Sequence, residues 1–119
     1  MLKLLISGGA EPNKAGSHKM SPLHFAAMLG SREVVKELLS RGANPDSTDE
    51  KGWTPLHYAA RSANMGRVEV TRALLDGGAD CEKKSQSGDT PLSLAASPKV
   101  KGMIKDAIVK EKKYWFGWF

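Results

Sequence analysis

The chain carries three histidines and one cysteine, the residue types that most often ligate metals or take part in catalysis. His24 and His57 follow Pro-Leu in two copies of one short phrase, at residues 21–27 and 54–60. Successive copies of a repeat stack about one helix diameter apart, roughly 10 Å, whereas zinc ligands each lie about 2 Å from a shared ion. We therefore expect both histidines to be structural, with ring nitrogens bonded to backbone or hydroxyl groups, and His18 to be an exposed loop residue.

Other features of the sequence give little support to catalysis. No Gly-x-Ser-x-Gly, phosphate-binding loop or His-Glu-x-x-His pattern occurs. Cys81 follows Gly-Ala-Asp and is expected to be a buried, inert thiol. Asp46, Asp49 and Glu50 cluster in a segment that is polar because it forms a loop. The sequence predicts no enzyme, no cofactor and no metal site.

Composition indicates a soluble protein of one domain. The 119 residues include 40% apolar and 26% charged residues, with a formal net charge of +5. No apolar run approaches the roughly 18 residues needed to cross a bilayer. A single cysteine excludes an internal disulfide and favours a reducing, intracellular compartment. Residues 2–10 parallel residues 35–43, so the chain is expected to start in the middle of a repeat and to be a fragment of a longer protein, which leaves the organelle open.

A third copy of the phrase, at residues 90–96, shows that the chain is built from repeats. The prolines of the three copies, Pro22, Pro55 and Pro91, lie 33 and 36 residues apart, and Gly-Ala turns follow at residues 42–43 and 78–79. The period and the Thr-Pro-Leu-His phrase resemble the ankyrin repeat. The resemblance implies an all-α solenoid of stacked helix-turn-helix repeats joined by hairpin-like loops.

The repeat sets the expected boundaries of a single domain at residues 1–113. A half repeat at 1–15 precedes repeats at 16–48 and 49–84, and a degenerate capping repeat follows at 85–113. The second repeat holds three extra residues between its helices, within residues 61–65, which favour a lengthened inner helix, a protruding loop or a neutral change of length. In the last repeat Ser93 replaces the histidine, and the outer helix is expected from Val100 to about Lys113.

Binding of another protein or peptide is the function that the resemblance implies, because ankyrin-like stacks bind through hairpin tips and the exposed face of the inner helices. Trp53 is the strongest candidate, since tryptophan is enriched at energetic hot spots; the alternative is a tryptophan packed over its own hairpin. Met20, Met28 and Leu29 either add an apolar strip or pack under the neighbouring hairpin. The full set carried over by position is Ser17, His18, Met20, Met28, Leu29, Glu50, Lys51, Trp53, Arg61, Ser62, Gln86, Ser87 and Asp89.

The C-terminal residues 114–119 form a tail that the repeat does not explain. They hold five of the eight aromatic residues, and residues 99–113 before them carry six lysines against two acids, a net +4. The tail caps the stack, docks into a partner or a second copy, or lies on an anionic membrane surface as a peripheral anchor. Nucleic acid is a weaker alternative. The aromatic residues predicted to dock are Tyr114, Trp115, Phe116, Trp118 and Phe119.

Overall fold

The fold is a two-row stack of helices with loops projecting along one edge. The computed structural model describes residues 16–62 and 65–116, with the backbone alone at Ser17, 65–67 and 111–116. Within these ranges every regular element is a helix, which confirms the all-α prediction. The elements are η1 (Ser17–Lys19), α2 (Pro22–Leu29), α3 (Arg32–Ser40), α4 (Pro55–Arg61), α5 (Met65–Asp76), α6 (Pro91–Leu94) and α7 (Pro98–Phe116).

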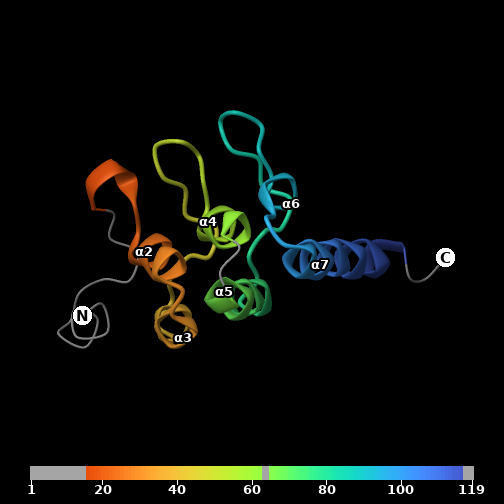
Figure 1. Ribbon diagram of the computed structural model, residues 1–119, viewed down its shortest axis with the longest axis horizontal. Helices are drawn as coiled ribbons and strands as arrows, with labels where there is room; N and C mark the ends of the chain where they lie inside the picture. The colour runs from red at the N-terminus through yellow and green to blue at the C-terminus, as the bar shows by residue number, and fades with distance from the viewer. Residues whose placement is uncertain (1–15, 63–64, 117–119) are drawn as a thin grey trace.

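The inner helices α2, α4 and α6 stack in sequence, and α3 packs beside α5 in the outer row (Figure 1). The loops that precede the three inner helices point the same way, side by side. Figure 1 views α2 to α5 almost end-on but α7 from its side, so α7 lies at a steep angle to the other helices and runs away from the stack. It contacts α5 and α6.

The start of each inner helix is determined locally by its capping residues. Ser21, Thr54 and Thr90 each accept a hydrogen bond from the backbone N–H three residues later, and a proline follows each of them at the first helical position. A hydroxyl at this position satisfies a helix N–H that has no partner within the helix, and proline has no such N–H to satisfy. The repeated Ser/Thr-Pro therefore fixes where each repeat begins.

The motif histidines connect each repeat to the next. Nδ1 of His24 accepts the backbone N–H of Ser21 at 3.0 Å, and Nε2 donates to the carbonyl of Trp53 at 2.7 Å. His57 has the same arrangement, accepting from Thr54 at 3.0 Å and donating to the carbonyl of Asp89 at 2.8 Å. Both rings are fully buried. The structural role predicted for these histidines is confirmed.

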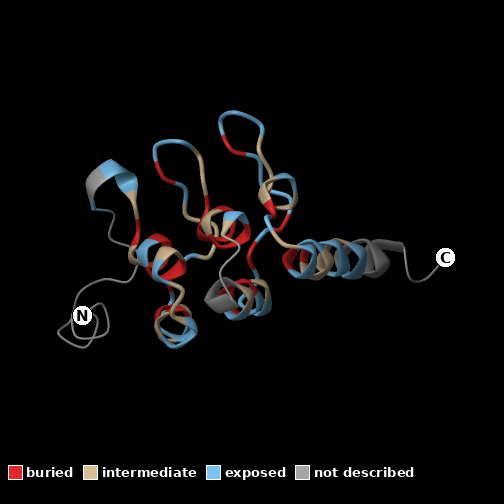
Figure 2. Cartoon of the chain, in the orientation of Figure 1, coloured by how far each residue is buried: buried red, intermediate tan, exposed pale blue. Residues whose placement is uncertain are grey.

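The core lies between the two rows of helices (Figure 2). The inner helices contribute one fully buried leucine in each of the first two repeats, together with Ala-Ala pairs that let neighbouring helices approach closely. The outer helices contribute a pair of aliphatic side chains from each repeat. The buried apolar residues of these two kinds are Leu23, Ala26, Ala27, Leu56, Ala59, Ala60, Val35, Leu38, Val70, Leu74, Val100 and Ile104.

The loop before α4 is a tight hairpin-like turn that contacts both neighbouring loops. Its backbone closes between Asp49 and Trp53, with an N–H to carbonyl distance of 3.0 Å. The N–H of Glu50 donates to the carbonyl of His18, and the carbonyl of Lys51 accepts from Gln86 in the next loop. Gly52 has φ +77°, and a Cβ there would lie 2.9 Å from the backbone nitrogen of Gln86. Only glycine meets both requirements.

The three extra residues of the second repeat lengthen the outer helix. The inner helix α4 ends at Arg61, so the alternative of a lengthened inner helix is wrong. Helices α3 and α5 both begin ten residues after the proline of their repeat, but α5 has 12 residues and α3 has 9. The additional turn of α5 takes up the insertion; residues 63–64 before it lie outside the described residues.

The last repeat has a shorter inner helix than the other two repeats and an outer helix that is longer than predicted. Helix α6 ends at Leu94, so its Ala-Ala pair is not helical, and the N–H of Ala96 donates instead to the carbonyl of Ala60 in the preceding repeat. Helix α7 begins at Pro98 rather than Val100, because the Ser97 hydroxyl accepts the N–H of Val100 and proline suits the first helical position. It continues past Lys113 to Phe116, so three tail residues belong to this helix.

The buried ring of His24 gives a prediction about pH. Burial lowers its pKa below the ordinary 6.5, and outweighs the upward effects of the bond to Trp53 and the charge of Asp49. Below pH 6.5 the imidazole of His24 therefore binds a proton more readily in the unfolded chain than in the folded one, so acid favours unfolding. We expect the free energy of unfolding, from urea titrations, to fall as the pH drops below about 6.5.

His24→Ser tests the assignment, because Ser93 occupies the same position in the last repeat. The variant should be less stable at neutral pH and should lose the part of the acid dependence that comes from the ring. His18→Ser removes an exposed histidine and should retain that dependence. An unchanged pH profile in His24→Ser would contradict the assignment.

Candidate functional site

Two hollows lie on the seam between the first and second repeats. One is formed at the loops and the other at the ends of the inner helices, and each encloses about 260 Å³. Tyr58 lines both, so its ring is the ridge between them. We call the two together the seam groove. Its lining residues are His18, Met20, Asp49, Glu50, Lys51 and Tyr58 at the loops, and Met28, Tyr58, Arg61 and Ser62 at the helix ends.

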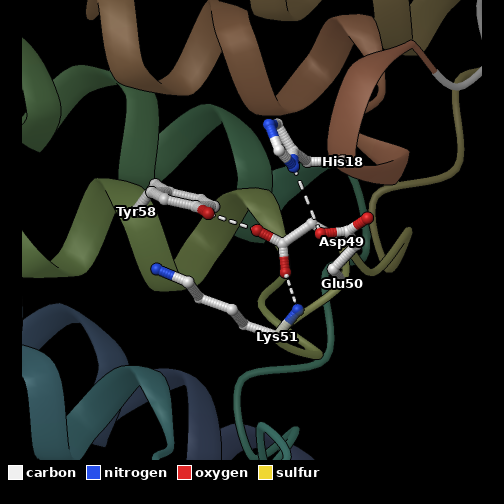
Figure 3. A network of polar contacts seen from close by, with 5 residues as sticks. All are labelled: His18, Asp49, Glu50, Lys51 and Tyr58. Carbon is white, nitrogen blue, oxygen red and sulfur yellow. Dashed lines mark hydrogen bonds and ion pairs between the residues drawn. The ribbon is translucent and has the colours of Figure 1, made fainter.

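Asp49 holds the ridge in place. Its side chain accepts the backbone N–H groups of Lys51 and Trp53, each at 2.9 Å, and the Tyr58 hydroxyl donates to its other oxygen (Figure 3). The residue is only 7% exposed. Burial alone would raise the pKa of Asp49, but the bonds from Tyr58, Trp53 and Lys51 outweigh it and hold the pKa below its ordinary value. Asp49 is therefore a structural carboxylate whose charge is already satisfied by three donors.

The hydroxyl of Tyr58 is fixed as a donor by its hydrogen bond to Asp49. Burial and the adjacent carboxylate of Asp49 raise the pKa of Tyr58 well above its ordinary value. The phenol therefore stays protonated and remains a hydrogen-bond donor across the physiological range.

Trp53 supports the groove from below the helix ends. Its ring stacks on His57 with centroids 5.9 Å apart and lies 4.9 Å from the ring of Tyr58. The guanidinium carbon of Arg61 lies 5.4 Å from the indole centroid, within the range of a cation–π contact. Trp53 is half-buried and packs on the helix of its own repeat. Its replacement by alanine would therefore change stability as well as any binding.

At the loop end of the groove, His18 and Glu50 interact across adjacent repeats. Nδ1 of His18 lies 3.2 Å from a carboxylate oxygen of Glu50, and both side chains are exposed (Figure 3). The backbone of His18 and Lys19 is left-handed, with φ +59° at each residue. The backbone and side-chain bonds to Glu50 hold this uncommon conformation in place.

The structure brings together seven residues of the predicted binding set and separates others. Trp53 is adjacent to them through Tyr58 and Arg61, whereas Leu29 is 69% exposed and lines neither hollow. Gln86, Ser87 and Asp89 lie on the third loop and line neither hollow; the side chain of Ser17 lies outside the described part of the chain. The seven that line the groove are His18, Met20, Met28, Glu50, Lys51, Arg61 and Ser62.

Sequence reasoning missed Asp49 and Tyr58, which organise the groove. An alignment of the repeats could have revealed them. The residues equivalent to Asp49 and Tyr58 are Gly16 and Phe25 in the first repeat, and Ser85 and Leu94 in the last. Only the middle repeat places an acid and a phenol at these two positions. The remaining tail predictions cannot be placed: the side chains of Tyr114, Trp115 and Phe116 lie outside the described residues, as do Trp118 and Phe119 entirely.

Among the residues that the structure describes, side chains with catalytic or ligating potential form no cluster that could hold a metal ion. Cys81 is 1% exposed, as predicted for a buried thiol. Across residues 16–62 and 65–116, His, Cys, Asp and Glu side chains do not gather in threes where they could hold a metal ion. No helix within these ranges is long and apolar enough to cross a membrane.

The architecture is that of a repeat solenoid with a groove on its loop-bearing edge. A family model for ankyrin repeats in three copies matches residues 1–85, and the chain belongs to the ankyrin-repeat family. Modules of this family typically bind other proteins and are not catalytic. None of the curated proteins compared with the chain matches it.

The Asp49–Tyr58 interaction predicts the effect of removing one hydroxyl. Tyr58→Phe leaves a buried carboxylate without one of its three donors, which costs about 1–3 kcal/mol of the free energy of unfolding at neutral pH. The pKa of Asp49 is lowered in the folded protein, so its ionised carboxylate stabilises the fold fully only above the ordinary pKa of 3.8. The difference in unfolding free energy between Tyr58→Phe and wild type should therefore narrow as the pH falls below about 3.8. Chemical denaturation across this range measures both effects.

Phe25→Tyr is the matched control, since the first repeat has Gly16 in place of the aspartate. The added hydroxyl should not raise the free energy of unfolding, because no carboxylate is present to accept its hydrogen bond. Equal stability of Tyr58→Phe and wild type at neutral pH would show that the hydroxyl does not support the carboxylate.

Proposed function

We propose that the chain binds a segment of a partner protein along the seam groove, on the face formed by loop tips and inner helices. The observation that supports this most directly is the pair of hollows on either side of Tyr58, lined by residues from two loops and two inner helices. Each hollow is smaller than the 300–1,000 Å³ or so of a typical small-molecule pocket. Their size and spacing suit successive side chains of a peptide better than one compact ligand.

The rigidity of the groove favours tight binding. Tyr58 is held by Asp49, and Arg61 lies over the ring of Trp53, so these side chains have little freedom left to lose when a partner arrives. Ordering a mobile side chain at an interface costs about 0.5–1.5 kcal/mol. Half-buried Met28 and Met20 add adaptable apolar surface in the two hollows.

A display library of random peptides, selected on the full chain, supplies ligands for a direct test of this surface. Met28→Glu places a charge in the hollow at the helix ends and should weaken the selected peptides at least tenfold, as expected for loss of a contact worth more than about 1 kcal/mol. Titration calorimetry measures the affinity, and circular dichroism checks that the variant is folded.

Val109→Glu is the matched control, because Val109 is 61% exposed on α7 and outside the groove. This variant should bind the selected peptides with an affinity within about twofold of wild type. If Met28→Glu binds as tightly as wild type, or if no peptide is selected at all, the seam groove is not a peptide-binding surface.

A membrane-peripheral role, or self-association, through the C-terminal region is the second candidate. Helix α7 extends beyond the stack (Figure 1). Four lysines are exposed along it: Lys99, Lys101, Lys105 and Lys110. Basic side chains next to aromatic residues suit an anionic surface.

Vesicle binding and oligomeric state test this candidate. Co-sedimentation with vesicles rich in phosphatidylserine should pellet the full chain more than a chain ending at Lys113. Concentration-dependent mass in analytical ultracentrifugation, lost on the same truncation, would instead indicate self-association. If the two chains stay in the supernatant and sediment as monomers, both forms of this candidate fail.

A further inference from the structure

We propose that the seam groove selects a partner segment carrying an acidic side chain, which Arg61 binds in the hollow at the helix ends. This inference rests on the proposed function and adds the chemistry of the partner. It is argued from which charged groups of the groove are already engaged within the protein and which remain available to a ligand.

The acidic groups of the groove are engaged. Asp49 accepts three hydrogen bonds and is 7% exposed, so its carboxylate has little capacity for a ligand. Glu50 pairs with His18 at 3.2 Å. By contrast, among the ion pairs between residues that the structure describes, none involves Lys51 or Arg61. Among the residues that line the hollow at the helix ends, Arg61 is the one charged residue, so the charge that this hollow presents to a partner is positive.

Arg61 is positioned for carboxylate recognition. The cation–π contact with the indole of Trp53, 5.4 Å from the guanidinium carbon to the ring centroid, holds the guanidinium beside the hollow. A guanidinium held in this way matches the two oxygens of a carboxylate with parallel hydrogen bonds. The side chain of Arg61 is exposed to solvent, so a ligand reaches it directly.

The neighbours of Arg61 define the rest of the acidic residue's surroundings. Met28 lines the same hollow and offers a half-buried apolar surface to the methylene groups of a glutamate or to an adjacent apolar residue. Lys51 lies in the other hollow, beyond Tyr58, where its charge offsets that of the neighbouring Glu50. An Asp or Glu next to an apolar residue is the pattern that fits.

The peptides selected on the full chain test this pattern. We expect them to share an acidic residue flanked by an apolar one. Replacing that acid by its amide should weaken binding about tenfold or more, the loss expected for a hydrogen-bonded charge pair. Arg61→Gln should weaken the parent peptide to the same extent.

A double-mutant cycle assigns the contact. If Arg61 binds the acid, Arg61→Gln and the amide peptide together lose no more than either change alone. Arg61→Lys keeps the charge but loses the planar geometry, and should recover only part of the affinity. Arg72→Gln removes an exposed arginine of α5 outside the groove and should have no effect beyond about twofold.

The outcomes separate this inference from the function on which it rests. Peptides that are weakened by Met28→Glu but lack a shared acid, or that bind Arg61→Gln as well as wild type, overturn the acidic preference and leave the groove as a binding surface. Peptides that are insensitive to both variants, or a selection that yields none, overturn both. Peptides that share a basic residue would show that Glu50, rather than Arg61, is the charged residue that binds the peptide, and would overturn the inference.

Discussion

The rest of the structure depends on a buried imidazole that bonds in two directions. Nδ1 accepts the N–H of the residue that caps its own helix, and Nε2 donates to the carbonyl that precedes the cap of the next repeat. Because Nδ1 accepts an amide proton, the ring proton must be on Nε2, which is the tautomer that the second bond requires. One side chain thus ends a loop, begins a helix and aligns two repeats. The buried ring has both nitrogens satisfied, and protonation would place two donors face to face at Nδ1.

The last repeat lacks this interaction. Ser93 replaces the histidine, is exposed, and bonds within its own cap, to the N–H and carbonyl of Thr90. The inner helix α6 of this repeat is short, and α7 runs away from the stack at a steep angle instead of continuing the outer row (Figure 1).

The features that sequence reasoning predicted are those set by residues a few positions apart. The caps, the proline starts and the histidine bonds follow from one short phrase, so copies at a fixed period were enough to predict the stack. Asp49 and Tyr58 were missed because their contact forms across a turn and depends on a pair that the other repeats do not share. The start of α7 was predicted two residues late, although Ser97 before Pro98 is a helix cap of the same kind as those of the inner helices. The hollows need the relative placement of two repeats, which no local pattern contains.

Scaffold and groove meet at Trp53. Its carbonyl accepts the repeat-aligning bond from His24, its N–H donates to the buried carboxylate of Asp49, and its ring supports Arg61. The residue proposed to bind the partner's acid therefore rests on an indole whose backbone is fixed by the contact between the first two repeats. Since the seam groove is lined from both of these repeats, a ligand bound there stabilises their alignment, and a well-aligned seam pre-organises the groove for the ligand. Stability of the stack and affinity of the groove are thus linked through one residue, even though the ring and the backbone of Trp53 serve different purposes.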